Sequence, residues 1–371
     1  MTEEAKEHEE LCVFLFCEYY HTHVGDLHHV WFEPDMVDNV RELATATLES
    51  PLDEAILNQA LDLFNLMYPC RTSRCVPPVP TGQFEATLER LRAQPKNAQR
   101  TPEWYESRHN LITASSAHKM FGTQSEQNSL IVEKCAPEKE RPPLSLHDAR
   151  HWGVRYEPVS TMYYSVTRDT EVEEFGCLVH PVYRFLGASP DGINIKEGSE
   201  VHGRMLEIKN PVSRVITGDP IPDYWIQMQM QMEVCDIDSC DFLETRFIEY
   251  DTYESFYADG TFAASADGKP KGVILLFSKE GKFVYAYAPY GALEEAVTAW
   301  EKAEKQEEGR EFVQTLYWRL EAVSCVLVLR NRGWFNAHQE SMGRFWHTVC
   351  AERSSNEWTQ RLPAKKTPTW D

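Results

Sequence analysis

The first hundred residues carry apolar side chains at helical spacing. Leu52 to Tyr68 places them three or four residues apart on one stripe, and Val37 to Leu48 follows the same period. Glu10 to Tyr20 is apolar and aromatic, and Thr87 to Gln94 has the pattern of a further short helix. A stretch rich in proline, from Pro69 to Gly82, interrupts the pattern as a connection would. The pattern predicts a helical N-terminal region.

The middle of the chain mixes helical and strand-like patterns. Thr101-Pro102-Glu103 is typical of a helix start, with threonine at the N-cap and proline at the first helical position. Alternating apolar runs separated by turn residues predict strands. The predicted helices are Arg150 to Val166 and Tyr224 to Cys235, and the predicted strands are Thr170 to His180, Tyr183 to Ser189, Arg204 to Ile208, Asp241 to Tyr250, Gly272 to Ser278 and Phe283 to Pro289.

The last two predicted strands form a hairpin. The region after it, Leu293 to Trp346, is predicted to be mostly helical, and the tail from Leu362 to Asp371 to be loose. The chain is therefore expected to comprise a helical N-terminal extension over 1–98, an α/β core over 99–290 and a helical C-terminal region over 291–371.

Charge at first argues against a nucleic-acid partner. The 371 residues hold 37 Lys+Arg and 58 Asp+Glu, a net charge of −21, whereas phosphate binding needs basic surface. The acidity is uneven, however: residues 1–98 sum to −10 and residues 100–155 to +1. A narrow local groove for nucleic acid therefore stays compatible with the composition.

Other features of the sequence predict an intracellular protein. The N-terminus, Met1 to Glu10, is acidic rather than basic, unlike a signal peptide, and no run of about 18 apolar residues predicts a membrane span. Ten cysteines without a secretory signal favour an intracellular, reducing compartment. The Cys-x4-Cys pairs are interpreted as structural rather than zinc-binding, and the cluster His21, His23, His28 and His29 as a solvated loop.

The sharpest chemical signal is Ser189-Pro190-Asp191-Gly192 followed by Leu206-Glu207-Ile208-Lys209. Alternate residues of a strand share a face, so Glu207 and Lys209 are expected to face a cleft while Leu206 and Ile208 face the core. Glycine turns allow Asp191 to lie close to Glu207. Two neighbouring carboxylates suit a divalent cation such as Mg²⁺ or Mn²⁺, and the set is that of metal-assisted phosphodiester hydrolysis. The alternative is a solvated Glu–Lys face on a hairpin.

Asp191 with Glu207-x-Lys209 resembles the signature of the PD-(D/E)xK nuclease superfamily. Surrounding motifs resemble the branch of phage lambda exonuclease and the YqaJ-type viral recombinases, which is related to the herpesvirus alkaline nucleases. The motifs, in order, are Trp104-x3-Arg108-x3-Ile112-Thr113-Ala114-Ser115, Trp152-Gly153-x2-Tyr156-Glu157, Gly187-Ala188-Ser189-Pro190-Asp191-Gly192, Leu206-Glu207-Ile208-Lys209-Asn210-Pro211 and Tyr224-x2-Gln227-Met228-Gln229. They cover about Gln99 to Val234, and the resemblance implies a restriction-endonuclease-like core with a mixed central sheet flanked by helices.

The resemblance also implies roles in a metal site. Asp191, Glu207 and the backbone carbonyl of Ile208 would hold two Mg²⁺ ions, Glu157 would assist at the second, and Lys209 would position the attacking water. A glutamine of the following helix would complete the site. Counting from Tyr224 favours Gln229, with Gln227 as the other choice; Gln227 and Gln231 lie one helical turn apart and share a face.

Arg108 and Ser115 resemble the residues that grip a terminal 5′-phosphate in this branch, and Gln99 is a further candidate. A guanidinium and a hydroxyl suit that ligand chemically, whereas a surface salt bridge is the alternative for Arg108. Phage lambda exonuclease lacks an N-terminal extension like residues 1–98, so the resemblance does not imply its ring-shaped trimer for this chain.

The expected function is a Mg²⁺-dependent exonuclease that hydrolyses linear double-stranded DNA 5′ to 3′ for recombination or DNA processing. One alternative is an endonuclease or an RNA-degrading nuclease, and another is a non-catalytic recombination scaffold that binds nucleic acid. The resemblance implies a single-strand annealing protein as partner. If the source is a virus, the expected location is the host cytoplasm or nucleus.

Overall fold

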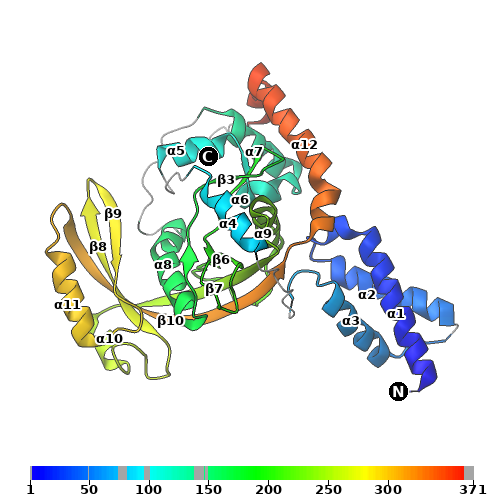
Figure 1. The fold of residues 1–371 in the computed structure, drawn as a ribbon, viewed down its shortest axis with the longest axis horizontal. Coiled ribbons are helices and arrows are strands. Elements are labelled where there is room, and N and C mark those ends of the chain that lie inside the picture. Colours follow the sequence, from blue (N-terminus) through cyan, green and yellow to red (C-terminus); the bar gives the residue numbers. More distant parts are fainter. Residues whose placement is uncertain are drawn as a thin grey trace, which may run out of the picture.

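The computed structural model describes residues 2–48, 50–73, 82–95, 101–137, 146 and 149–362. The described chain is elongated, with a helical unit at one end, an α/β core in the middle and an arm of strands and helices at the other end (Figure 1). The predicted α/β class with helical additions is confirmed. None of the described helices has the length and apolar content that a bilayer-spanning segment needs.

The N-terminal unit consists of α1 (Glu3–Thr22), α2 (Phe32–Leu48) and α3 (Glu54–Met67), joined in part by a short 3-10 helix, Val24–Asp26. The side chains of Thr2 and Asp53 accept hydrogen bonds from the first turns of α1 and α3, as N-cap residues do. Apolar stripes at helical spacing face inward and form a common core: Cys12, Phe16, Met36, Val40, Leu57 and Phe64.

Helix α12 (Arg332–Ser355) attaches this unit to the core. The Asn331 side chain donates to the Tyr20 hydroxyl at 2.6 Å, and the Trp334 indole donates to His28 Nδ1 at 3.1 Å. His28 is buried, so its interpretation as part of a solvated loop is wrong. The sequence could not reveal this, because the covering Trp334 lies about three hundred residues away.

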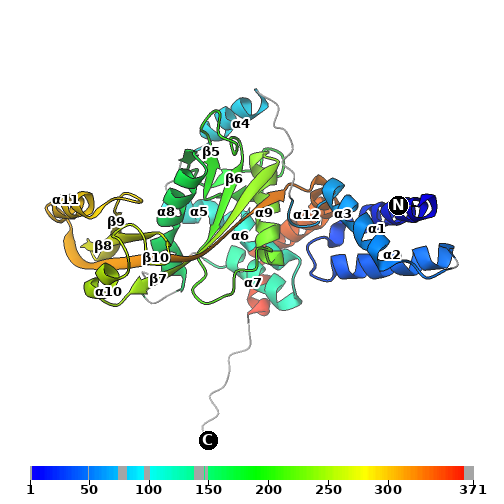
Figure 2. The ribbon, with the colours of Figure 1, turned by 90° about the horizontal axis from the view of Figure 1, so that it is seen from below.

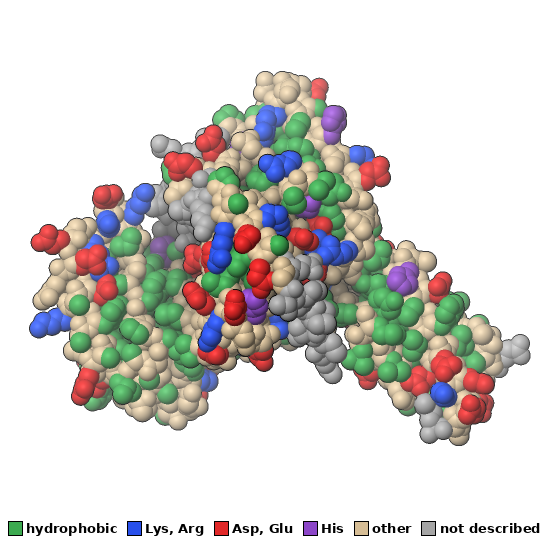
Figure 3. Space-filling view, viewed as in Figure 1, with side chains coloured by type: hydrophobic (Ala, Val, Ile, Leu, Met, Phe, Trp, Pro, Cys, Tyr) green, Lys and Arg blue, Asp and Glu red, His purple; other side chains and the backbone are tan. Residues whose placement is uncertain are grey.

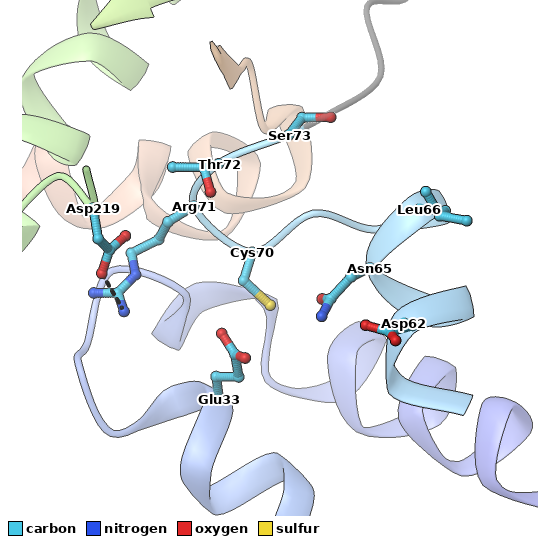
Figure 4. A pocket seen from close by; sticks show the side chains of 9 residues that line it. All are labelled: Glu33, Asp62, Asn65, Leu66, Cys70, Arg71, Thr72, Ser73 and Asp219. Atoms are coloured by element: carbon cyan, nitrogen blue, oxygen red, sulfur yellow. Dashed lines mark ion pairs between the residues drawn. The ribbon is translucent and has the colours of Figure 1, made fainter. Parts of the chain in front are cut away.

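A second attachment lies beneath α3. Arg71 forms an ion pair with Asp219 at 3.2 Å, and Ser73 forms a β-bridge with Leu327. Figure 4 shows this junction, where the loop after α3 passes between the helical unit and the core beside a cavity of about 540 Å³. The unit is thus tied to the core at two places.

Seven strands of the described chain form the central sheet, in the order β2-β5-β6-β7-β10-β8-β9. Strands β6 and β7 are parallel and their neighbours are antiparallel, so the sheet is mixed. A smaller sheet has the order β1-β4-β3. The strands are β1 (Ile112–Thr113), β2 (Val172–Glu173), β3 (Leu178–Val179), β4 (Leu186–Ala188), β5 (Gly192–Asn194), β6 (Met205–Lys209), β7 (Ser239–Tyr250), β8 (Lys271–Lys279), β9 (Lys282–Tyr287) and β10 (Glu311–Leu329).

Helices cover both faces of the sheet around β7. Phe242 packs toward α9, whereas its strand neighbour Leu243 packs toward α8, as the two-residue period of a strand requires. Figure 2 shows α8 and α9 on either side of β6 and β7. The remaining α-helices are α4 (Gln83–Arg92), α5 (Pro102–His109), α6 (Ala114–Ala117), α7 (Gln124–Cys135), α8 (Ala149–Thr167), α9 (Pro222–Cys235), α10 (Tyr253–Ala258) and α11 (Glu294–Lys305).

Strand β10 corrects one expectation. The sequence reading made Leu293 to Trp346 mostly helical, but residues 311–329 form a strand between β7 and β8. The run is rich in aromatic and β-branched residues, and Leu316, Trp318 and Leu320 alternate as buried positions, which favours a strand. The central sheet therefore continues past residue 290, the predicted end of the core, and the predicted domain boundaries stay a prediction.

Candidate active site

The predicted motifs meet at one cavity of about 230 Å³ in the core. Gly192 pairs with Leu206 across β5 and β6, which brings Asp191 alongside the middle of β6. The Ile208 backbone N–H donates to Asp191 Oδ2 at 2.7 Å and fixes the carboxylate there. A Cβ at Gly192 would lie 2.0 Å from Val172 Cγ1, so the close approach of β2 explains the glycine that follows Asp191.

Strand β6 presents its charged residues to the cavity, as the alternation predicts. Leu206 and Ile208 are buried in the apolar cluster on the α8 side, although Ile208 also contacts the cavity wall. Glu207 is only 1% exposed, and Lys209 Nζ donates to Glu207 Oε1 at 2.5 Å. The same ammonium lies 4.9 Å from the centre of the Tyr224 ring, so a cation–π contact also holds it.

Two glutamines of α9 fix the Glu207 carboxylate. Gln227 Nε2 donates to Oε1 and Gln231 Nε2 donates to Oε2, each at 2.7 Å. Gln227 Oε1 in turn accepts from Lys209 at 3.2 Å. The two glutamines lie one helical turn apart, so both reach the same carboxylate.

The structure places Gln229 elsewhere, which corrects the choice that favoured it. Its side chain donates to the Leu329 carbonyl at 2.9 Å and accepts from the Asn331 N–H at 2.7 Å, at the end of β10. The reason is the helical period: residues two apart point about 200° apart, so Gln229 cannot share a face with Gln227. Gln231 shares the face of Gln227, as the helical period predicts, and it is an addition to the predicted site.

Negative charge accumulates at the cavity. Burial raises the pKa of Asp191 well above its usual range, and the Glu207 and Glu157 carboxylates raise it further. Burial alone would lower the pKa of Lys209, but Glu207 and Asp191 outweigh it and raise that pKa, so Lys209 stays an ammonium. Glu157 contacts the cavity from α8. A single lysine therefore faces three carboxylates, an excess that a divalent cation would relieve.

The donor set suits Mg²⁺ or Mn²⁺ chemically. Asp191, Glu207, Glu157 and Ile208 line one cavity, and hard cations prefer carboxylate and carbonyl oxygen ligands such as these residues can offer. Gln231 Oε1 is also buried there without a hydrogen-bond partner among the described residues. Within that part of the chain, no group of three or more His, Cys, Asp or Glu side chains is already arranged as a metal cage.

Arg108 forms the other side of the cavity. Its guanidinium donates to Ser115 Oγ at 2.9 Å, to Ser189 Oγ at 3.3 Å and to Thr113 Oγ1 at 3.4 Å. It also stacks 4.3 Å from the Trp104 ring centre. Thr101 caps α5 and so positions the helix that carries Arg108, as predicted. These contacts hold the Arg108 guanidinium and several hydroxyl groups at one end of the cavity.

The structure thus brings together most of the predicted residues and adds others. Gln99 lies outside the described residues. Ser189 is an addition to the predicted site, and its place two residues before Asp191 is the sequence signal for it. The predicted residues that line the cavity are Arg108, Ser115, Glu157, Asp191, Glu207, Ile208, Lys209 and Gln227.

Comparison with known proteins agrees with these motifs. The family model of the YqaJ-like viral recombinase domain matches residues 103–238. An uncharacterized protein of Acanthamoeba polyphaga mimivirus is 28% identical over 314 residues, which cover 74% of this chain and 56% of that protein. The chain thus spans little more than half the length of this curated relative.

Solved structures of exonucleases are also similar. An alkaline exonuclease from Laribacter hongkongensis has a TM-score of 0.42 and 19% identity, over 70% of this chain and 98% of that one. A phage-related exonuclease from Haemophilus somnus has a TM-score of 0.35 and 13% identity, over 65% and 96%. The family match covers the motifs that build the cavity, and residues 103–238 of this chain are similar to the YqaJ-like viral recombinase domain.

Proposed function

We propose that this protein is a Mg²⁺-dependent exonuclease that degrades linear double-stranded DNA from a 5′-phosphorylated end. One observation carries the proposal: a single cavity holds the acidic group of Asp191, Glu207 and Glu157 with Lys209, and also the Arg108 group with Ser115 and Ser189. The first suits phosphodiester hydrolysis and the second suits binding of a terminal phosphate. The family match over residues 103–238 supports both assignments.

The acidic group would hold the metal. Asp191, Glu207 and the Ile208 carbonyl would ligate one Mg²⁺ or Mn²⁺ ion, with Glu157 at a second. A bound divalent ion supplies an acidified water and stabilises charge on the phosphate and the leaving oxygen. Gln227 and Gln231 hold both oxygens of Glu207 in place, so the carboxylate is preorganised for this role.

Lys209 has two tasks in this proposal. Its raised pKa keeps it protonated, so it donates hydrogen bonds and positive charge rather than accepting a proton. In the present arrangement it donates to Glu207 and Gln227. When the scissile phosphate enters, its remaining N–H can orient the attacking water toward phosphorus and stabilise the charge that develops there.

The Arg108 group would select the DNA end. A guanidinium and the hydroxyls of Ser115 and Ser189 are donors that match phosphate oxygens. Trp104 stacks on the guanidinium and restricts its orientation. Because a terminal monophosphate has one more negative charge than an internal phosphodiester, this end of the cavity favours a 5′-phosphorylated terminus over internal sites.

The test compares substrates that differ in one feature. Purified protein is incubated in Mg²⁺ or in EDTA with 5′-phosphorylated linear duplex, 5′-hydroxyl linear duplex, closed circular duplex and structured RNA. We expect release of mononucleotides only from linear duplex with Mg²⁺, fastest with the 5′-phosphate. Asp191→Asn should abolish it, and Asp251→Asn, an exposed aspartate outside the cavity, should not.

Other outcomes assign the alternatives. Cleavage of closed circles identifies an endonuclease, and cleavage of RNA identifies a ribonuclease. Duplex binding without any metal-dependent cleavage in the wild type identifies a binding scaffold. Equal nucleotide release by wild type and Asp191→Asn contradicts the assigned site. A single-strand annealing protein as partner stays a prediction.

A further inference from the structure

The N-terminal unit has a second apolar surface, separate from its core. A groove of about 590 Å³ runs between α1 and α3, and its apolar lining is Val13, Phe14, Leu63, Leu66 and Met67. The buried core of the unit uses other positions of the same helices, such as Phe16 and Phe64. Each helix therefore carries two apolar stripes, one buried inside the unit and one in the groove.

The groove exposes large apolar side chains to solvent. Phe14 is 59% exposed, Leu66 56% and Met67 53%. In the space-filling view, hydrophobic surface extends over this unit and acidic side chains gather toward its tip (Figure 3). A single exposed apolar side chain needs no explanation, but a continuous groove of them marks an interaction surface.

The shape of the groove suits a helix. Its lining on α1 comes from residues 6, 9, 10, 13 and 14, which form one face over two turns, and α3 contributes residues 63, 66 and 67. A trough between two packed helices is the surface into which the ridge of a third helix fits. An amphipathic helix lays its apolar stripe into such a groove at positions i, i+3, i+4 and i+7.

Glu9 indicates the charge of the occupant. It lines the groove beside Glu10, and the residue as a whole is 6% exposed. Two carboxylates beside an apolar groove favour a lysine or arginine on the bound helix, because opposite charges attract across an interface. Among the residues that line the groove, Lys6 is basic, whereas Glu9 and Glu10 are acidic.

The two helices that form the groove, α1 and α3, are also negatively charged. Together α1 and α3 contain eight acidic residues and one basic residue. A second copy would bring acidic surface against acidic surface, and anionic lipid would be repelled. Charge complementarity therefore selects an occupant with Lys or Arg beside its apolar stripe.

We propose that this groove binds an amphipathic helix of another protein, one whose apolar stripe is flanked by lysines and arginines. The helical unit projects from the core at the end opposite the arm, away from the sheet that carries Asp191 and Glu207 (Figures 1 and 2). A partner bound there leaves the catalytic cavity open and tethers it near the partner. The inference does not rest on the proposed nuclease activity.

The test uses the full chain and two synthetic helical peptides. Both carry leucines at i, i+3, i+4 and i+7; one has lysines beside the leucine stripe, and the other has glutamates there. Fluorescence anisotropy of the labelled peptides gives the dissociation constants at physiological salt. The variants are Leu66→Ser in the groove, Glu9→Gln at its base, and Leu293→Ser, an exposed leucine of the arm, as the matched control.

We expect the lysine peptide to bind at least about tenfold more tightly than the glutamate peptide. Leu66→Ser and Glu9→Gln should each weaken binding by roughly tenfold, the effect of losing about 1.4 kcal/mol, while Leu293→Ser leaves it unchanged. Circular dichroism checks that each variant folds. The proposal is overturned if neither peptide binds, if both bind equally, if the groove variants bind like wild type, or if Leu66→Ser converts a dimer to a monomer in light scattering.

Discussion

Arg108 donates a hydrogen bond to Ser189 Oγ at 3.3 Å, across 81 positions of the chain. Ser189 lies two residues before Asp191, whose carboxylate accepts from the Ile208 N–H. The proposed phosphate grip and the proposed metal site are thus joined through one short segment. A shift at either would move the other, because two residues of extended chain span only about 7 Å.

Replacing Arg108 with alanine should remove the preference for a 5′-phosphate. Charge-assisted hydrogen bonds are worth about 1.5–3 kcal/mol, so the rate ratio between 5′-phosphorylated and 5′-hydroxyl duplex should fall by roughly ten- to hundredfold. Single-turnover digestion of the two substrates measures the ratio. Arg344→Ala is the control, since Arg344 is an exposed residue of α12. An unchanged ratio in Arg108→Ala would place the phosphate elsewhere.

Replacing Gln231 and replacing Gln229 should have different effects, the first on activity and the second on stability. Gln231→Ala removes a hydrogen bond to Glu207 Oε2, and loss of such support for a ligand typically costs 10- to 100-fold in activity or metal affinity. We expect slower cleavage and a higher Mg²⁺ requirement with modest change in stability. Initial rates against Mg²⁺ concentration measure both.

Gln229→Ala should instead lower stability. It leaves the Leu329 carbonyl and the Asn331 N–H without their side-chain partner, at a cost of about 2–4 kcal/mol in the free energy of unfolding. The folded fraction should cleave at the wild-type rate, as measured at a temperature well below its unfolding midpoint. Loss of cleavage in fully folded Gln229→Ala would return this residue to the site.

Mg²⁺ should stabilise the folded protein through Asp191. A ligand at 100 times its dissociation constant adds about 2.7 kcal/mol to the free energy of unfolding. The unfolding midpoint of wild type in EDTA should therefore rise with added Mg²⁺, while that of Asp191→Asn stays constant. Differential scanning fluorimetry gives this readout without any substrate. Equal shifts in both proteins would show that the ion binds at another place.

His28 should make stability fall in mild acid. Burial lowers its pKa to about 4, with His29 and His338 contributing, whereas an unfolded histidine titrates near 6.5. Between these values the unfolded chain binds the proton that the folded chain excludes, so stability is full above about pH 6.5 and declines as pH falls toward 4. The loss should be roughly 2–3 kcal/mol.

The comparison of His28→Gln with wild type isolates this effect. Urea unfolding at pH 7.5 and pH 5.0 should show a smaller decline in the variant, because glutamine does not titrate. His347→Gln, at an exposed histidine of α12, should decline like wild type. A decline of the same size in all three proteins would assign the acid sensitivity to other groups.

The parts of the fold and site that could be predicted are local. Helix α3 and helix α9 follow from apolar spacing, and the positions of Glu207 and Lys209 follow from strand alternation. Asp191 could be placed because its motif and that of β6 lie on adjacent strands joined by a short connection. In each case a few neighbouring residues contain the whole pattern.

The parts that could not be predicted depend on distant partners. Gln227 and Gln229 both follow the motif tyrosine, and only the docking angle of α9 decides which one faces Glu207. His28 is buried because Trp334 covers it. Strand β10 has charged and polar residues that also suit a helix, and its pairing with β7 and β8 decides in favour of a strand.

The position of β10 has a consequence for how the chain is made. Strands β7 and β8 leave the ribosome first, yet β10 lies between them in the finished sheet. Until about residue 329 has emerged, the facing edges of both strands have unpaired N–H and C=O groups, which invite pairing with other chains. All the proposed catalytic residues have been synthesised once Gln231 is reached. The sheet that carries them is complete only after β10, about a hundred residues later, has also been synthesised.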